Sequence, residues 1–589
     1  MAQRTVCALW RHAVTTAPSS PAFLVEEGDA WRPVGWREAG RRVDELAAGF
    51  LSLGVGPGDR VAILCRTRLE WTLVDYALIA IGAVVVPLYP TASPAEWTHV
   101  LAHSAARMVV VEGAAERDRV ERLPGLRALE RAVAIEDGEL DGLAERGRDL
   151  LRRDPQAVAR AGARVGADDL LTLVYTSGTT GPPKGCLLTH RNYRAMAEIA
   201  HRVPGLLVAG DVAVLHLPLA HVFARLVQFL GPEAQLTIAH CPDVSGLAAA
   251  LRGVRPTLLP SVPRLFEAMR AAVTAGIERE TGSRRRLAGW ALAVGRRAAL
   301  LRREGRRLGP SLAFQLALAD RLVLSPVRAR FGGRLRLAVS GGARLAPEVV
   351  DFFDALGLPV LDGYGLTEAT TVVAVNPPGR HRPGTVGPPM AGVEVRIAPD
   401  GEILVRAETV FAGYLDDAPA TTAALGAGGW LHTGDVGVLD ADGYLAVTDR
   451  KRDIIVTPGG ENVSPQNVED ALRASRYIAE ALVVGEGRPY LVALLALEQH
   501  AARAAGTPEA VRDLVGRTVA DVNRGLGLAE RVRRFAILPR DFLPERGEVT
   551  PTLKLRRRVC EEHFRDVIES LYAGAGRPVP GSAPGRCPG

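Results

Sequence analysis

The stretch YTSGTTGPPKG spans residues 175–185 and directly follows the apolar run LLTLV at residues 170–174. An apolar run that ends at a cluster of Ser, Thr and Gly is typical of a buried strand followed by a loop. The N–H groups and hydroxyls of such a loop can surround phosphate oxygens, because its glycines let the backbone approach them closely. The stretch therefore predicts a phosphate-binding loop, with an ordinary polar surface loop as the alternative.

The spacing in this loop differs from the P-loop pattern. That pattern needs Gly-Lys-Ser/Thr, whereas Pro182 and Pro183 separate Lys184 from the preceding glycine. Lysine itself is rare here: of 72 basic residues, only Lys184, Lys451 and Lys554 are lysines. Arginine presents a planar fork, whereas lysine presents a compact ammonium that reaches a single phosphate or carboxylate oxygen. Each lysine is therefore a candidate for a specific ionic contact, with codon bias as the alternative.

The patterns around the loop predict an α/β fold. From Gly54 onward, short β-branched runs alternate with longer amphipathic segments, an order typical of helix layers on largely parallel strands. After about residue 388 the strand candidates shorten, and Asp-Gly pairs at 400–401 and 442–443 predict β-hairpins. We expect a large N-terminal domain of layered α/β subdomains at residues 1–449, including a β subdomain at about 388–449.

The C-terminal part predicts a second domain. The texture of the sequence changes after Asp449, so we place a hinge at residues 450–452 and a small, mobile α+β domain at 453–573. A chain of 589 residues exceeds what one hydrophobic core usually organises, which agrees with two domains. Residues 574–589 have too little apolar content to pack, and we expect a disordered tail there.

Composition argues against several classes of protein. The apolar segment Ala77–Val86 is much shorter than the roughly 20 residues of a membrane-spanning helix. The N-terminus lacks the pattern of a secretory signal, so a cytoplasmic location is expected. The six cysteines are widely spaced with no CxxC pair, which argues against a disulfide framework or a zinc site.

Positive charge gathers in one segment. Residues 270–307 contain eleven arginines and three glutamates, although the net charge of the whole chain is only +6. The arginines interleave with apolar residues at roughly helical spacing and predict an amphipathic helical pair with a cationic face. That face is either solvated or a surface for anionic lipid or an acidic partner. Nucleic acid is not expected as a partner, because no recognition motif accompanies the arginines.

Six further segments follow the loop in a fixed order: LPLAHVFAR at 217–225, SGGA at 340–343, DGYGLTE at 362–368, GWLHTGD at 429–435, DRKRD at 449–453 and TPTLKLRRR at 550–558. Together with the loop they resemble the adenylate-forming superfamily of acyl-CoA synthetases, adenylation domains and luciferases. Because the matches keep their order across most of the chain, chance does not explain them.

The resemblance implies that ATP and Mg²⁺ are used to join a carboxylate to AMP. This step brings two anions together, so the site must neutralise charge and hold an in-line geometry. By resemblance, Thr179 and Glu368 bind Mg²⁺. Thr367 donates to the α-phosphate, Asp435 accepts from the ribose hydroxyls, and Arg450 contacts the ribose or phosphate region. The residues expected around ATP or AMP are Thr176, Ser177, Gly178, Thr179, Thr180, Gly342, Ala343, Asp362, Gly363, Tyr364, Gly365, Thr367, Asp435 and Arg450.

Structural alternatives remain for three of these predictions. Glu368 would also suit a helix N-terminus, and Asp435 would also suit a turn. The resemblance places His221 beside the acyl carboxylate, in an acyl pocket that consists of His221, Phe223, Gly341 and Gly342. A lone histidine after an apolar run is alternatively a hydrogen-bonded core residue.

By resemblance, the residues that take part in catalysis are Lys554, His221, Thr367 and Lys184. Lys554 differs from the other three in its position. It lies on the second domain, and its ammonium would stabilise charge that develops in the transition state only when that domain closes. The resemblance implies a later rotation that withdraws the lysine. Arg452 occupies the hinge position, where the family usually has Asp or Lys.

The segment PGGENVSP at residues 458–465 resembles the long-chain branch of the fatty acyl-CoA synthetases. It implies a fatty acid and coenzyme A as substrates, with Gly459, Gly460 and Glu461 at the CoA site; a glycine-rich turn is the alternative. The Arg-rich helical insert at about 270–330 also resembles that branch, and its cationic face suggests peripheral binding at the inner face of a membrane. Two other functions stay open: a fatty acyl-AMP ligase that serves a carrier protein, and a catalytically silent lipid-binding or scaffold protein.

Overall fold

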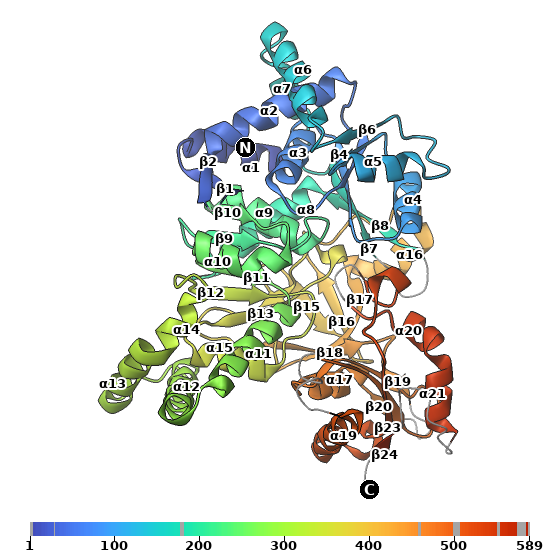
Figure 1. Cartoon of the computed structure of the whole chain (residues 1–589). Coiled ribbons are helices and arrows are strands. Elements are labelled where there is room, and N and C mark those ends of the chain that lie inside the picture. The colour runs from blue at the N-terminus through green and yellow to red at the C-terminus, as the bar shows by residue number, and fades with distance from the viewer. Residues whose placement is uncertain are drawn as a thin grey trace.

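The N-terminal part of the chain is built on two sheets whose strands are largely parallel. The computed structural model describes residues 4–28, 30–176, 182–456, 461–498, 507–550, 554–573 and 585–586. Figure 1 shows the two sheets, whose strands run in colour from blue through green to yellow. The first has the order β6-β5-β3-β4-β7-β8, with strands Arg131–Ala134, Met108–Val111, Arg60–Leu64, Val84–Leu88, Leu170–Thr176 and Lys184–Thr189. The second has the order β14-β13-β12-β11-β9-β10-β1-β2, with strands Ala374–Val375, Val360–Tyr364, Leu337–Ser340, Leu258–Ser261, Val212–Leu215, Thr237–His240, Pro21–Glu27 and Ala30–Gly35.

These strands form where the sequence is continuously apolar. Strands β4 and β5 are buried along their whole length, and β3 pairs in parallel with both. Such runs are typical of parallel strands that helices cover on both faces. Strands β2, β8 and β14, at the sheet edges, pair antiparallel with their neighbours. The predicted α/β fold with largely parallel strands is confirmed.

Helices pack on and between the two sheets. They are α1 (Val6–Thr16), α2 (Trp36–Ser52), α3 (Leu69–Ala80), α4 (Pro94–His103), α5 (Ala114–Glu121), α6 (Glu139–Arg153), α7 (Ala157–Gly162), α8 (His190–His201), α9 (Val222–Ala234), α10 (Leu247–Val254), α15 (Pro347–Ala355) and α16 (Ala418–Ala424). The apolar segment Ala77–Val86 forms the end of α3 and the start of β4, and is a core element as predicted. The five cysteines in the described part of the chain are buried and free.

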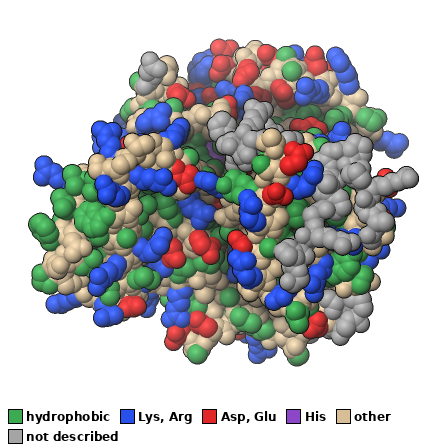
Figure 2. Space-filling view, turned by 60° about the horizontal axis from the view of Figure 1, so that its bottom comes forward, with side chains coloured by type: hydrophobic (Ala, Val, Ile, Leu, Met, Phe, Trp, Pro, Cys, Tyr) green, Lys and Arg blue, Asp and Glu red, His purple; other side chains and the backbone are tan. Residues whose placement is uncertain are grey.

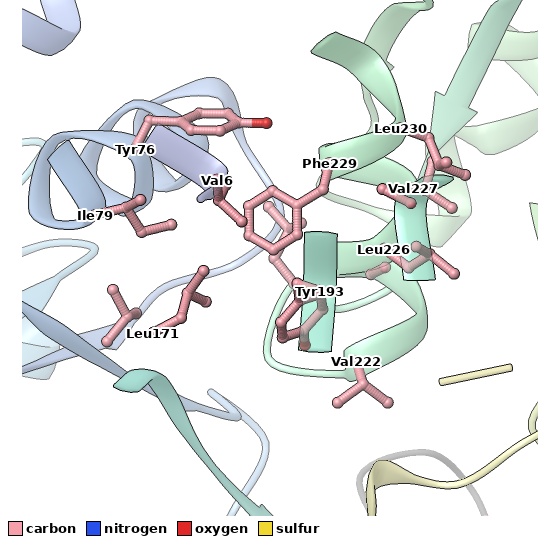
Figure 3. Packing of buried hydrophobic residues seen from close by; sticks show 14 of the residues in the cluster. Val6, Tyr76, Ile79, Leu171, Tyr193, Val222, Leu226, Val227, Phe229 and Leu230 are labelled. Carbon is pink, nitrogen blue, oxygen red and sulfur yellow. The ribbon is translucent and has the colours of Figure 1, made fainter. Parts of the chain in front are cut away.

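Aromatic packing joins the two sheets into one body. Figure 3 shows Phe229 of α9 beside Tyr193 of α8 and Tyr76 of α3. Both contacts are edge-on, with ring centroids 5.0 Å apart for Tyr193 and 5.8 Å apart for Tyr76, an arrangement that aromatic rings prefer. The same cluster contains Leu171 of β7. The packing therefore fixes β7, which leads into the phosphate loop, relative to α9, which follows His221.

A four-stranded antiparallel sheet forms the predicted β subdomain. Its strands are β15 (Glu394–Ile397), β16 (Glu402–Arg406), β17 (Leu431–Leu439) and β18 (Leu445–Arg450). The two Asp-Gly pairs lie in its turns, where Gly401 and Gly443 have φ angles of 85° and 81°, as tight turns need. Both predicted hairpins are confirmed. The register places Asp435 opposite Arg450.

The C-terminal part has its own sheet and hydrophobic core, and is α+β as predicted. Its elements are β19 (Ile455–Val456), β20 (Asn462–Val463), α17 (Pro465–Arg473), β21 (Ile478–Val484), β22 (Leu491–Leu497), α19 (Pro508–Arg524), β23 (Val532–Ile537), α20 (Arg557–His563), α21 (Arg565–Tyr572) and β24 (Gly585–Arg586). In the predicted tail, β24 pairs with β23. The expected disorder of residues 574–589 stays a prediction. The rest of the tail lies outside the described residues.

The Arg-rich insert forms a helical layer that Figure 1 shows extending from the body at the lower left. It consists of α11 (Pro263–Arg279), α12 (Gly282–Arg303), α13 (Pro310–Ala319), a π-helical turn η2 (Asp320–Leu324) and α14 (Ser325–Ala329). The predicted helical pair corresponds to α11 and α12, and the insert continues into further helices. Within the described ranges, no helix is both long and apolar enough to cross a bilayer.

Candidate active site

A cleft of about 1280 Å³ lies where the two large sheets, the β subdomain and the C-terminal part meet. It brings together most of the predicted site residues that the structure describes: Thr176, Lys184, His221, Phe223, Gly341, Gly342, Gly363, Tyr364, Gly365, Thr367, Glu368, Asp435, Arg450, Arg452 and Lys554. The wall includes residues from the ends of β7, β12, β13 and β18, from within β17, and from helix α4. A crevice beyond the ends of parallel strands is the usual ligand site of open α/β sheets.

One side of the cleft is built around Asp435, the predicted ribose residue. The hydroxyl of Tyr364 donates to its Oδ2 at 2.6 Å, and Nε of Arg450 lies 3.6 Å from Oδ1. Burial raises the pKa of Asp435, and the nearby Arg450 and the Tyr364 hydroxyl partly offset that effect. Since Asp435 sits within a strand and is held by two partners, the structure does not support the turn alternative.

Glu368 and Lys184 are held by a pair of residues that sequence reasoning missed. The Tyr414 hydroxyl donates to Oε1 of Glu368 at 2.8 Å. Lys184 Nζ lies 3.1 Å from Oδ2 of Asp417 and 5.3 Å from the centre of the Tyr414 ring. Tyr414 therefore positions the carboxylate of Glu368, and Asp417 positions the ammonium of Lys184. Both residues lie in a loop before α16 that contains none of the sequence motifs, so the sequence did not indicate them.

The carboxylate oxygens of Glu368 are hard ligands, which suit a cation that is also bound by phosphate oxygens. No group of three or more His, Cys, Asp or Glu that could hold a metal is found in the described part of the chain, and Thr179 lies outside it. Mg²⁺ binds through one or two carboxylates together with substrate phosphate and water. Glu368 lines the cleft with one oxygen bonded to Tyr414, so its other oxygen is the protein ligand that we expect for Mg²⁺.

Lys554 reaches the cleft from the C-terminal part. Its backbone is fixed by two hydrogen bonds: its N–H donates to Oγ1 of Thr550 at 3.0 Å, and its carbonyl accepts from the Thr550 N–H at 2.8 Å. Burial and, to a smaller extent, the charge of Arg450 lower the pKa of Lys554 to about 8, although Asp435 and Glu368 act in the opposite direction. The ammonium therefore lies within electrostatic reach of residues that the N-terminal part contributes.

His221 caps helix α9 and faces the same cleft. Its Nδ1 accepts from the backbone N–H of Phe223 at 3.2 Å, so the proton of the neutral ring is on Nε2. Burial, together with the charge of Lys554, lowers the pKa of His221 to about 4. A Cβ added at Gly341 would lie 3.4 Å from the Phe223 ring, so this glycine keeps the wall beside the ring open.

Two predicted nucleotide residues are absent from the cleft wall, namely Ala343 and Asp362. The Oδ2 of Asp362 accepts from the Leu345 N–H at 3.3 Å, and burial raises its pKa to about 8. Asp362 thus supports the backbone behind the SGGA segment. Gly365, which does line the cleft, has no room for a side chain, because a Cβ there would lie 1.3 Å from the carbonyl oxygen of Thr371.

Several predictions fall on residues that the structure does not describe. Ser177, Gly178, Thr179 and Thr180 of the phosphate loop, and Gly459 and Gly460 of the predicted CoA site, lie outside the described ranges. Glu461 is described and exposed. The residues on both sides of the loop, Thr176 and Pro182, do line the cleft, so the loop starts and ends where the prediction needs it.

The chain belongs to the AMP-binding enzyme family. The family model of the AMP-binding enzyme matches residues 10–415, and that of the AMP-binding enzyme C-terminal domain matches residues 452–576. Long-chain-fatty-acid–CoA ligase FadD15 of Mycobacterium tuberculosis is 38% identical over 566 residues, which cover 92% of each chain. The peroxisomal long chain acyl-CoA synthetase 7 of Arabidopsis thaliana is 30% identical over 94% of this chain and 83% of the relative. The resemblance to adenylate-forming enzymes of the long-chain fatty acyl-CoA branch is confirmed.

Solved structures share the fold. The adenylation domain of a carboxylate reductase from Mycobacterium chelonae has a TM-score of 0.77 and 24% identity, and the match covers 97% of this chain and 91% of that one. An anthranilate CoA ligase in complex with anthranoyl-AMP has a TM-score of 0.74 and 22% identity, with 97% and 99% covered.

Proposed function

We propose that this protein is an AMP-forming long-chain fatty acid–CoA ligase. The observation that carries the proposal is the placement of Lys554, from the C-terminal part, in one cleft with Asp435, Tyr364 and Glu368 of the N-terminal part. The two relatives described above, which are aligned over 92% and 83% of their length, are named as long-chain acyl-CoA ligases or synthetases.

In the first half-reaction, a fatty acid carboxylate oxygen attacks the α-phosphorus of ATP, and the bond to pyrophosphate breaks. The Lys554 ammonium stabilises the charge that builds up between these anions, while Asp435 orients the ribose and Thr367 donates to the α-phosphate. Mg²⁺ at Glu368 would neutralise phosphate charge. His221, which is neutral at physiological pH, orients the carboxylate with its Nε2–H and adds no charge of its own.

In the second half-reaction, the thiol of CoA attacks the acyl carbon of the adenylate, and AMP leaves. Lys554 is not needed for this step. The C-terminal domain can therefore turn about a hinge at Arg452, withdraw Lys554 and present residues 459–461 to CoA. A fatty acyl-AMP ligase, which would hand its adenylate to carrier-protein phosphopantetheine, shares the first half-reaction only.

The test is incubation of the pure protein with ATP, Mg²⁺ and saturated fatty acids of increasing chain length, with and without CoA. The ligase is expected to release pyrophosphate with long chains and to form acyl-CoA when CoA is present. Acyl-AMP without acyl-CoA would support the carrier-protein alternative. No acid-dependent pyrophosphate release would support a catalytically silent protein and overturn the proposal.

The first half-reaction is expected to slow at alkaline pH. Since the pKa of Lys554 is lowered to about 8, its ammonium is present below that pH and is lost as the pH rises through it. Values of kcat/KM for ATP report the free enzyme, and should therefore fall above pH 8 with the slope of one ionising group. A Lys554→Arg variant keeps its charge and should lose this decline, even if it is slower. An unchanged decline in that variant would assign the ionisation to another group.

We further propose that the Arg-rich insert binds an anionic bilayer, where long-chain acids partition. Figure 2 shows hydrophobic side chains among Lys and Arg side chains at its left, where the insert extends. Phe314, Leu318 and Leu322 form a stripe spaced by four residues along α13 and η2, and Phe314 is 72% exposed. Arginines 284, 285, 286, 296, 297, 302, 306 and 307 are exposed on or next to α12. Helices that lie on a membrane surface usually insert apolar side chains into it and attract anionic lipids with cationic ones.

Sedimentation with phosphatidylglycerol vesicles at low salt checks this proposal. The protein is expected to bind these vesicles, to bind phosphatidylcholine vesicles much less, and to be released by salt. Each arginine near the surface contributes about 1 kcal/mol, so the triple variant Arg284→Gln/Arg285→Gln/Arg286→Gln should lower partitioning about a hundredfold. Phe314→Ser should also weaken binding, whereas Leu528→Ser, at an equally exposed position in the C-terminal part (73%), should not. Absence of vesicle binding at low salt would contradict the proposal.

A further inference from the structure

One face of helix α4 contacts three separate parts of the active site. Glu96, His99 and His103 are three and four residues apart, a spacing that places them on the same face of a helix. Glu96 contacts Arg556 of the C-terminal part, His99 contacts the carbonyl of Pro183, and His103 contacts the hydroxyl of Tyr175. All three residues line the cleft, although no motif in the sequence includes them.

The carboxylate of Glu96 is held in place before Arg556 reaches it. Glu96 and Ser93 form a capping box: the Ser93 N–H donates to Oε2 of Glu96, and the Glu96 N–H donates to Oγ of Ser93, both at 3.2 Å. A carboxylate in the first turn of a helix is also stabilised by the helix dipole. Oε1 is thereby left for Arg556, whose Nη2 donates to it at 2.6 Å.

Arg556 belongs to the same short hairpin as Lys554. Val549 and Leu555 form an antiparallel bridge, and the Arg556 N–H donates to the carbonyl of Glu548 at 2.8 Å. The backbone of Lys554 is tied to Thr550 within this hairpin. Because these hydrogen bonds fix the backbone of the hairpin, a contact that holds Arg556 also sets the position of Lys554.

The other end of the helix face holds the base of the phosphate loop. Nε2 of His99 lies 2.9 Å from the carbonyl oxygen of Pro183, and a carbonyl only accepts, so this nitrogen carries the proton and donates. Pro183 directly precedes Lys184. Nδ1 of His103 lies 2.9 Å from the hydroxyl of Tyr175, near the end of β7. Helix α4 therefore connects the base of the phosphate loop with the hairpin of Lys554.

We propose that Glu96 and Arg556 are positioning residues for adenylation: their ion pair locks the Lys554 hairpin onto α4 and so aligns the ammonium with the nucleotide phosphates. This inference rests on the proposed function, because it concerns the first half-reaction of the ligase. The pair must break when the C-terminal domain turns for the second half-reaction, so it stabilises one of two conformations only.

A second interdomain ion pair provides a matched control. Nη1 of Arg476 lies 2.7 Å from Oε2 of Glu278 on α11, and both side chains are about half exposed. Neither residue lines the cleft. If Arg556 acts only by adding contact area between the domains, loss of the Arg476 pair should have the same effect.

The experiment measures both half-reactions in Glu96→Gln, Arg556→Gln, the double variant and Arg476→Gln. Loss of a hydrogen bond between two partly buried charged groups is expected to lower the population of the conformation that it stabilises by about a factor of ten. Each of the first two single variants is therefore expected to lower kcat for acid-dependent pyrophosphate release about tenfold, with little change in KM for ATP. The double variant should be no slower than the slower single one, because both changes remove the same contact. Arg476→Gln should be close to the unmodified protein.

Thioester formation from supplied acyl-AMP separates positioning from damage to the fold. It should be unchanged or faster in the Glu96 and Arg556 variants, because the competing conformation is destabilised. Equal losses in both half-reactions, effects that multiply in the double variant, or an equal loss in Arg476→Gln would each overturn the inference. Absence of pyrophosphate release from the unmodified protein would instead refute the proposed function.

Discussion

Lys554→Ala is expected to lower the rate of acyl-adenylate formation by about 10²–10³-fold, the effect of removing one preorganised charge donor from a transition state. The loss should appear in kcat, because the ammonium acts on charge that develops during the reaction, whereas Asp435, the residue that we propose orients the ribose, is unchanged. Acid-dependent pyrophosphate release measures this half-reaction. Formation of acyl-CoA from supplied acyl-AMP should remain close to normal, because that step requires no charge at position 554.

The control for this variant is Lys184→Ala. Lys184 is 44% exposed and is paired with Asp417, so its loss should raise KM for ATP more than it lowers kcat. Should Lys554→Ala abolish both half-reactions, one static arrangement would serve both steps and the two-conformation mechanism would be refuted.

Arg225→Leu is expected to destabilise the N-terminal part by about 3–5 kcal/mol, the cost of breaking a buried ion pair. Nη2 of Arg225 lies 2.6 Å from Oδ1 of Asp75, and both side chains are fully buried. The guanidinium carbon lies 5.3–5.7 Å from the ring centres of Phe229, Tyr193 and Trp71, two of which Figure 3 labels at the centre of the core. Removing the arginine leaves the Asp75 carboxylate without its cationic partner.

The double variant Asp75→Leu/Arg225→Leu provides the matched control. Replacing both members of a buried pair with apolar residues is often close to neutral, so it should recover most of the lost free energy of unfolding. Urea unfolding followed by tryptophan fluorescence measures the difference, since Trp71 belongs to the same cluster. A single variant as stable as the double one would show that the pair contributes nothing to the core.

Local sequence patterns predict the elements whose residues line the cleft, because each motif lies in a short stretch of chain. The run LLTLV forms β7, the Asp-Gly pairs form the two hairpins of the β subdomain, and the motif residues Tyr364, Glu368 and Asp435 meet in one cleft. Three lysines in an arginine-rich chain also identify informative positions. Lys184 and Lys554 line the cleft, and Lys451 does so beside Arg450.

Contacts between distant segments cannot be predicted in this way. Glu96 and Arg556 are separated by 460 residues, and nothing near either of them in the sequence indicates a partner. The support of Glu368 by Tyr414 likewise depends on how the loop before α16 packs. The pairing of β24 with β23 has a similar cause, since it forms through backbone hydrogen bonds that residue composition does not reveal.

Three hydrogen bonds tie Lys451 to the β subdomain. Its Nζ donates to Asp400 at 2.6 Å and to Glu402 at 2.9 Å, and its backbone N–H donates to the Gly434 carbonyl at 2.8 Å. The chain is thus held against the β subdomain at this residue, which agrees with the hinge that we propose at Arg452. A swing about that point would carry Lys554 away while Asp435 and Arg450 stay in place. The adenylate would then stay bound at Asp435 and Arg450 while Lys554 leaves the cleft and CoA enters it.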